Sequence, residues 1–172
     1  MLTRSAFLIL LVVFLTGDCA RAEEPKSAQD ALKAFLDVFA DADLEGMGRF
    51  YAPKVTVKKG STILDKRYGG LGGNDDGREK DQTVDRDTLL KAYETTIQKL
   101  GGKEDWVKRG QELKTVEVRY ITDESENADK IFPAVGARNG DVLAVVSPKR
   151  DALFFHLRKI DGKWRIIAEA WD

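Results

Sequence analysis

Hydrophobic residues recur every three or four positions up to about residue 115, which is typical of amphipathic helices. The pattern predicts three helices, over residues 28–39, 44–51 and 85–100. Pro53 ends the second helix, because proline lacks the amide hydrogen that would continue it. Residues 106–107 fit one further helical turn. The first part of the chain is therefore predicted to be largely helical.

The period changes from Val116 onward, where apolar and polar residues alternate as they do in a β-strand. We expect the rest of the chain to be sheet. Asp161-Gly162 predicts a two-residue hairpin turn, because both positions of such a turn favour a positive φ. The predicted strands cover residues 116–120, 142–146, 152–160 and 164–171, and two short strands are expected at 55–57 and 63–64.

A turn at Asp161-Gly162 pairs Ile160 with Lys163 and sorts the last two strands into two faces. A bulge that shifted the register by one residue would exchange the faces and bring His156 inside. The face predicted to meet the helices carries Leu153, Phe155, Leu157, Trp164, Ile166, Ala168 and Ala170. The opposite, mixed face carries Phe154, His156, Arg158, Arg165, Ile167, Glu169 and Trp171.

The order of these elements resembles the nuclear transport factor two-like superfamily, especially its SnoaL-like members, over roughly residues 28–172. The residues that carry the resemblance are Phe35, Phe39, Asp43, Leu44, Tyr51-Ala52-Pro53 with Val55, and Asp161-Gly162-Lys163-Trp164-Arg165-Ile166. The resemblance implies an α+β fold in which N-terminal helices pack on a curved antiparallel sheet and form a cone with a central pocket. The family includes isomerases, cyclases, dehydratases and epoxide hydrolases, and also members that only bind or assemble, so the fold does not decide the chemistry.

Residues 1–22 fit a signal peptide. Arg4 gives a positive start, residues 6–15 form an unbroken apolar run, and Ala20-Arg21-Ala22 has the small residues of a cleavage site. The run is too short to span a bilayer, which takes about 20 helical residues. We therefore expect a secreted or periplasmic protein whose mature part is a single domain over residues 23–172.

Cys19 offers an alternative to simple export, because a lipidated cysteine would anchor the chain to a membrane. Asp18 argues against it, since lipoprotein signals carry a small neutral residue before the cysteine. Membrane anchoring is expected only if Cys19 is lipidated. With cleavage after Ala22 the mature chain has no cysteine, which excludes a disulfide, a thiol nucleophile and a cysteine-ligated zinc site.

Composition excludes other classes of protein. The 172 residues contain 28 Lys and Arg against 29 Asp and Glu, and the basic residues form no stripe, so we expect no nucleic-acid partner. His156 is the only histidine, which excludes a multi-histidine metal site, and we expect no metal and no cofactor. Residues 69–82 read as a flexible glycine-rich loop that matches neither a phosphate-binding loop nor a calcium loop.

Candidate site residues follow from the predicted faces. Tyr51, Tyr93 and Tyr120 fall on interior faces, where each is either a ligand donor or an ordinary core aromatic. His156 is a weak catalytic candidate, and its placement on the mixed face favours a structural role. The predicted pocket is lined by Phe39, Tyr51, Tyr93, Tyr120, Phe155, Trp164, Ala168 and Ala170, of which the two alanines leave room for a ligand.

The sequence thus predicts a domain that binds a small, largely apolar molecule in the cone, with no catalysis assigned. One alternative is a cofactor-independent proton-transfer enzyme of isomerase, cyclase or dehydratase type, which would use His156 or a tyrosine. Another is a structural or interaction domain whose cone is filled by its own side chains. We also expect a homodimer through the mixed face at Phe154, Ile167 and Trp171.

Overall fold

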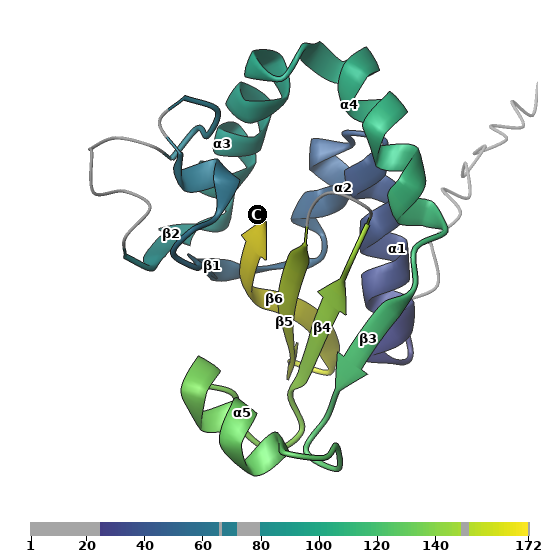
Figure 1. Ribbon diagram of the computed structural model, residues 1–172, viewed down its shortest axis with the longest axis vertical. Coiled ribbons are helices and arrows are strands. Elements are labelled where there is room, and N and C mark those ends of the chain that lie inside the picture. The colour runs from purple at the N-terminus through teal and green to yellow at the C-terminus, as the bar shows by residue number, and fades with distance from the viewer. Residues whose placement is uncertain (1–24, 66, 72–79, 149–151, 172) are drawn as a thin grey trace, which may run out of the picture.

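The computed structural model describes residues 25–65, 67–71, 80–148 and 152–171 (Figure 1). The predicted signal peptide with Cys19, and residues 72–79 of the predicted flexible loop, lie outside the described residues. The helices are α1 (Ala28–Ala40), α2 (Leu44–Gly48), α3 (Arg86–Lys99), α4 (Gly102–Gly110) and α5 (Ala128–Val135), with short 3-10 turns at Thr62–Leu64 and Gln111–Lys114. The strands are β1 (Tyr51–Val57), β2 (Gln82–Asp85), β3 (Val118–Ile121), β4 (Val142–Val146), β5 (Leu153–Ile160) and β6 (Lys163–Trp171).

The described strands form one sheet in the order β2-β1-β6-β5-β4-β3. Neighbours run antiparallel except β1 and β6, which are parallel, so the sheet is mixed where a purely antiparallel sheet was expected. Helices α1 to α4 gather in one part of the molecule, and α5 lies apart from them (Figure 1). The predicted α+β arrangement, with helices packed on a curved sheet, is confirmed.

Helix α1 begins where the sequence predicts. The Ser27 side chain accepts a hydrogen bond from the Asp30 amide at 3.1 Å, which satisfies one of the free donors of the first turn. The apolar stripe of α1 is buried, and Leu32 and Phe35 are fully enclosed. The next helix, α2, is shorter than predicted, and Asp43 caps it through the Gly46 amide at 3.0 Å.

The closing hairpin turns at Asp161 and Gly162, which have φ angles of 49° and 79°. Ile160 pairs with Lys163, so the predicted register of this turn is confirmed. The first half of the hairpin therefore has the predicted faces. We call the side of the sheet that carries Phe155 and faces α1 the inner face, and the side that carries His156 the outer face.

The register changes midway along β6. Leu157 pairs with Ile166, but the preceding residue His156 pairs with Ala168, so Ile167 is an extra residue on β6. This β-bulge reverses which residues of the rest of β6 point inward. Glu169 now pairs with Phe155 on the inner face.

Strand β1 begins at Tyr51, within the predicted second helix, and α4 is longer than the single turn predicted at 106–107. Three further elements differ from the sequence prediction. The sheet region is interrupted by α5, which packs Phe132 against Leu143 on the outer face. Strand β2 extends the sheet beside β1, and residues 62–64 form a 3-10 turn in place of a strand. Within the described residues, no helix is both long and apolar enough to span a bilayer.

Candidate functional site

A carboxylic acid lies in the interior between two tyrosines. Glu169 is only 2% exposed, on the inner face of β6. The Tyr93 hydroxyl, from α3, donates to Glu169 Oε1 at 2.6 Å, and the Tyr51 hydroxyl, from β1, donates to Oε2. Both tyrosines are 1% exposed. Each carboxylate oxygen therefore has one tyrosine as its partner.

Burial controls the protonation of this group. It raises the pKa of Glu169 from 4.5 to about 7, although the hydrogen bonds from Tyr51 and Tyr93 favour the charged form. The pKa values of both tyrosines are raised well above 10, first by burial and then by the neighbouring carboxylate. No Lys, Arg or His in the described part of the chain forms an ion pair with Glu169. Glu169 is therefore an interior acid whose pKa lies near neutral pH.

Glu169 is the functional candidate that the sequence did not identify. Uninterrupted alternation along β6 put it on the outer face and put Ala168 and Ala170 inside. The bulge at Ile167 reverses this, since Ala168 pairs with His156 and Ala170 with Phe154 on the outer face. The predicted inward placement of both alanines is wrong for this reason. The available signal was the single acidic residue in the apolar stretch from Ile166 to Trp171.

A cavity of about 650 Å³ opens at the end of the fold where α4, the Gln111–Lys114 turn and β5 meet. Three aromatic side chains, Phe39, Trp106 and Trp171, form one side of it, which we call the aromatic wall. The other lining residues are Leu100, Arg109, Gly110, Glu112, Leu113, Pro148 and Leu153. Among the lining residues that the structure describes, Arg109 and Glu112 carry the charged side chains.

The aromatic wall is closely packed. The Trp106 ring lies 5.2 Å from Phe39 and 5.2 Å from Trp171, centroid to centroid and edge to face. The Trp106 indole N–H donates to the Phe39 carbonyl at 2.7 Å, which fixes the ring. Gly110 allows α4 this position, because a Cβ atom there would lie 2.6 Å from the Ala40 carbonyl oxygen. The cavity is therefore largely pre-formed.

The aromatic wall separates the cavity from the buried acid. Phe39 lies on the cavity side and contacts Tyr93, with ring centroids 5.6 Å apart. Tyr93 in turn donates to Glu169, and neither residue lines the cavity. The order from solvent inward is thus cavity, aromatic wall, Tyr93 and Glu169.

The structure distributes the predicted pocket residues over several places. Phe39 lines the cavity, and Tyr51 and Tyr93 meet at Glu169. Phe155 is the cross-strand neighbour of Glu169, in the core.

Two further predicted residues lie away from this region. Tyr120 is half-buried on β3 and lines a separate, smaller hollow of about 290 Å³. Burial raises its pKa, with a smaller contribution from Asp30. Trp164 is half-buried and packs against the core near the hairpin turn, and it does not line the cavity.

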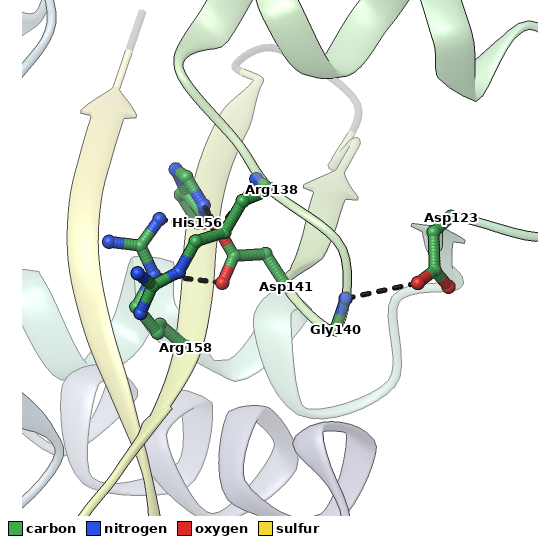
Figure 2. Close-up of polar contacts among 6 residues, drawn as sticks. All are labelled: Asp123, Arg138, Gly140, Asp141, His156 and Arg158. Carbon is green, nitrogen blue, oxygen red and sulfur yellow. Dashed lines mark hydrogen bonds and ion pairs between the residues drawn. The ribbon is translucent and has the colours of Figure 1, made fainter.

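His156 lies on the outer face, in a second polar cluster shown in Figure 2. Its Nε2 is 2.8 Å from Asp141 Oδ2, and both side chains are almost fully buried. Arg158 donates to the same carboxylate through Nε at 2.8 Å and Nη2 at 2.6 Å, and the Arg138 amide donates at 3.0 Å. Asp141 thus accepts hydrogen bonds from three residues.

The protonation states in this cluster follow from its contacts. Burial lowers the pKa of His156 below 6.5 against the opposing effect of Asp141, so the imidazole is neutral at pH 7. Burial alone would raise the pKa of Asp141, but the hydrogen bonds from Arg158 and His156 outweigh it and lower the pKa to about 2. The cluster joins the segment before β4 to β5 (Figure 2), which is a structural role.

The face predicted for the homodimer is also altered by the bulge in β6. Trp171 lies in the aromatic wall inside the molecule, and Phe154 packs in the α5 cluster. Of the three residues predicted for that face, only Ile167 lies outside both the aromatic wall and the α5 cluster, and it is half-buried.

Within the described ranges, no group of three or more His, Cys, Asp or Glu side chains is arranged to hold a metal ion.

No protein-family model and no curated protein matches the sequence. Among solved structures, the chain is similar to an NTF2-like protein of unknown function from Shewanella oneidensis, with 16% identity, a TM-score of 0.42, and coverage of 83% of this chain and 93% of that one. It is also similar to an NTF2-like protein of unknown function from Shewanella baltica, with 13% identity, a TM-score of 0.38, and coverage of 84% and 89%. A de novo designed protein with a curved β-sheet gives 16% identity, a TM-score of 0.35, and coverage of 84% and 95%. At these low TM-scores the similarities support no conclusion about a ligand or a reaction.

Proposed function

We propose that the chain binds a small, largely apolar molecule in the cavity at the aromatic wall. The observation that carries this proposal is the cavity of about 650 Å³ beside Phe39, Trp106 and Trp171. Its volume is in the range of small-molecule sites, about 300–1,000 Å³, and such sites are mostly apolar with few polar groups. A ligand there would remove apolar surface from water at about 25 cal/mol for each Å².

The packing of the wall favours binding over closure of the cavity. The Trp106 indole is held by the Phe39 carbonyl at 2.7 Å, and its ring contacts Trp171. Because these rings are already ordered, a ligand would not have to immobilise them, and this entropy cost of binding is avoided. Leu100, Leu113 and Pro148 are half-buried at the rim, where they can contact an apolar ligand.

Filling the cavity tests this proposal. Leu100→Trp places a large side chain at the rim, and we expect it to weaken binding of the neutral probe 2-phenylethanol about tenfold or more. Leu90→Trp is the matched control, because Leu90 is a half-buried leucine of α3 that does not line the cavity. Isothermal titration calorimetry measures both. Equal affinity in both variants, or no binding to the unaltered protein, would contradict the proposal.

Glu169 favours a second candidate function, cofactor-independent proton transfer. Its pKa of about 7 suits a group that takes up and releases a proton at neutral pH. Glu169 would remove a proton from the carbon next to a carbonyl group, and Tyr51 or Tyr93 would donate a hydrogen bond to the resulting enolate oxygen. The proton then returns from Glu169 to carbon. The substrate would have to pass the aromatic wall, and its C–H group would have to take the place of one tyrosine hydroxyl at the carboxylate.

Deuterium exchange distinguishes the two functions. With 4-phenyl-2-butanone in D₂O as the probe, proton transfer predicts exchange at the carbons next to the carbonyl above the rate in buffer, and loss of that exchange in Glu169→Gln. Glu94→Gln is the control, since Glu94 is exposed on α3. Exchange that is equal with and without the protein, or equal in Glu169→Gln, excludes this second function for the probe.

Export and dimerisation complete the proposal. Cleavage after Ala22 would release a mature chain that begins at Glu23, and mass spectrometry of the exported protein tests this.

A homodimer is also proposed, on the part of the outer face that α5 leaves uncovered near Ile167. A sedimentation mass equal to one chain would exclude the dimer.

A further inference from the structure

The charged residues of the cavity suggest what kind of molecule it binds. Among the residues that the structure describes, two charged side chains line it, Arg109 at the end of α4 and Glu112 in the turn that follows. Both are exposed at the rim. Within the described residues neither forms an ion pair, with the other or with a third group. The described lining thus carries one positive and one negative group that are both free to contact a ligand.

The two charges lie three residues apart, one in the last turn of α4 and one in the 3-10 turn that follows. Residues three apart on a helical turn have Cβ atoms about 5–6 Å from each other, which is close enough for one small head group to meet both. Trp106 lies three residues before Arg109 on the same face of α4, and both line the cavity. The apolar wall and the charged rim are therefore adjacent parts of one surface.

Exposure of the rim limits the cost of binding a charged group. A head group at Arg109 and Glu112 stays in contact with water, whereas a charge placed deeper, against the aromatic wall, would lose its hydration without a partner. Arg109 has the planar donor geometry that suits a carboxylate, and Glu112 can accept hydrogen bonds from an ammonium group. A ligand with one charge would leave the opposite rim charge unmatched.

We propose that the cavity binds a zwitterion with an apolar body, of the type of an aromatic α-amino acid. The carboxylate would pair with Arg109, the ammonium group with Glu112, and the ring would lie against the aromatic wall. This inference rests on the proposed binding of a small apolar molecule in the same cavity, and it adds the class of the head group.

Four related probes test the inference by calorimetry. Phenylalanine has both head charges, 3-phenylpropanoate has only the carboxylate, 2-phenylethylamine has only the ammonium group, and 2-phenylethanol has neither. We expect phenylalanine to bind tightest, about fivefold tighter than each singly charged probe, as for partly exposed ion pairs. Higher salt should reduce this difference, because the rim charges are exposed.

Charge-removing variants assign each head group. Arg109→Gln should reduce the affinity for phenylalanine to that for 2-phenylethylamine, and Glu112→Gln should reduce it to that for 3-phenylpropanoate. Lys108→Gln and Glu104→Gln are the controls, because both residues are exposed on α4 and do not line the cavity. They should leave all four affinities unchanged.

The outcomes separate this inference from the proposed function. If 2-phenylethanol or a singly charged probe binds as tightly as phenylalanine, the zwitterion is wrong and binding of apolar molecules stands. Control variants that weaken phenylalanine as much as Arg109→Gln and Glu112→Gln would also overturn it. If none of the four probes binds, both the inference and the proposed function are wrong.

Discussion

Glu169 has an environment that is unusual for an acidic side chain. It is enclosed among apolar side chains, and its hydrogen-bond partners are two neutral tyrosine hydroxyls. An ionised carboxyl in such a place loses hydration without the gain of a cation. The sequence predicted that Tyr51 and Tyr93 face the interior, but not that they share a carboxyl, because strict alternation put Glu169 outside.

The pH dependence of stability tests the state of Glu169. Its pKa is raised from 4.5 to about 7 in the folded chain, so below pH 4.5 both states are protonated and ionisation costs nothing. As the pH rises through 7 the wild type loses up to about 3 kcal/mol of stability. Glutamine at this position does not ionise, so Glu169→Gln keeps its stability over this pH range. The free energy of unfolding of Glu169→Gln minus that of the wild type should therefore increase by about 3 kcal/mol between pH 4.5 and pH 8.

Urea unfolding at several pH values measures this difference. Glu94→Gln is the control, because Glu94 is exposed on α3 and should follow the wild type at every pH. Parallel curves for wild type and Glu169→Gln would mean that Glu169 is not an interior acid with a raised pKa.

Asp141 has the opposite behaviour on the outer face. Its pKa is lowered to about 2 by contacts with Arg158 and His156 that outweigh the effect of burial. The stability it contributes is present above pH 3.8 and is lost as the pH falls through 2. Asp141→Asn should therefore destabilise the fold by about 1–2 kcal/mol at pH 7, allowing for solvent screening, and the difference should shrink on acidification.

Thermal unfolding between pH 7 and pH 2 compares Asp141→Asn with Asp123→Asn. Asp123 accepts a hydrogen bond from the Gly140 amide (Figure 2) and is exposed, so its variant should stay close to wild type. A constant effect of Asp141→Asn at every pH would show that the carboxylate charge is not what stabilises the cluster.

At the scale of elements, periodicity predicted α1, α3, β4 and the closing hairpin, because each has a continuous pattern bounded by a cap or a turn. Other elements depend on contacts between segments that are distant in the sequence. The bulge in β6 lies where that strand pairs with both β1 and β5, and its one local sign is the acidic Glu169 in an otherwise apolar stretch. Helix α5 has apolar residues at helical spacing, but it also contains Pro133, which lacks the amide hydrogen of a regular helix position.

Helix α5 is held by a small cluster of its own. Phe132 packs against Leu143, and this cluster is separate from the main core. Phe132→Ala should lower the stability of the contact between α5 and the sheet by about 3 kcal/mol, as for other buried phenylalanines. We expect faster hydrogen exchange of the α5 amides, with unchanged exchange in α3 and unchanged affinity for 2-phenylethanol. Loss of protection in α3 as well would mean that α5 is part of the main cooperative core.

At the scale of the whole molecule, the sequence predicted a cone of helices and sheet with an interior pocket, and the structure has the helices and the curved sheet. The interior is filled by aliphatic and aromatic side chains, among them Phe35, which contacts Tyr51 and Phe155 with ring centroids 5.3 Å apart. The space left for a ligand lies at one end, beside α4. Its position depends on how α1, α4 and β6 pack together, and this could not be predicted from the pattern of any one segment.

The indole N–H signals of the three tryptophans test the proposed binding site most directly. Trp106 and Trp171 line the cavity, whereas Trp164 lies outside it and serves as an internal control. In a titration with 2-phenylethanol followed by ¹H–¹⁵N NMR, we predict that the signals of Trp106 and Trp171 shift with a common dissociation constant and that the signal of Trp164 stays in place. If the Trp106 and Trp171 signals do not move, or if Trp164 moves as much as they do, the chain does not bind apolar molecules at the aromatic wall.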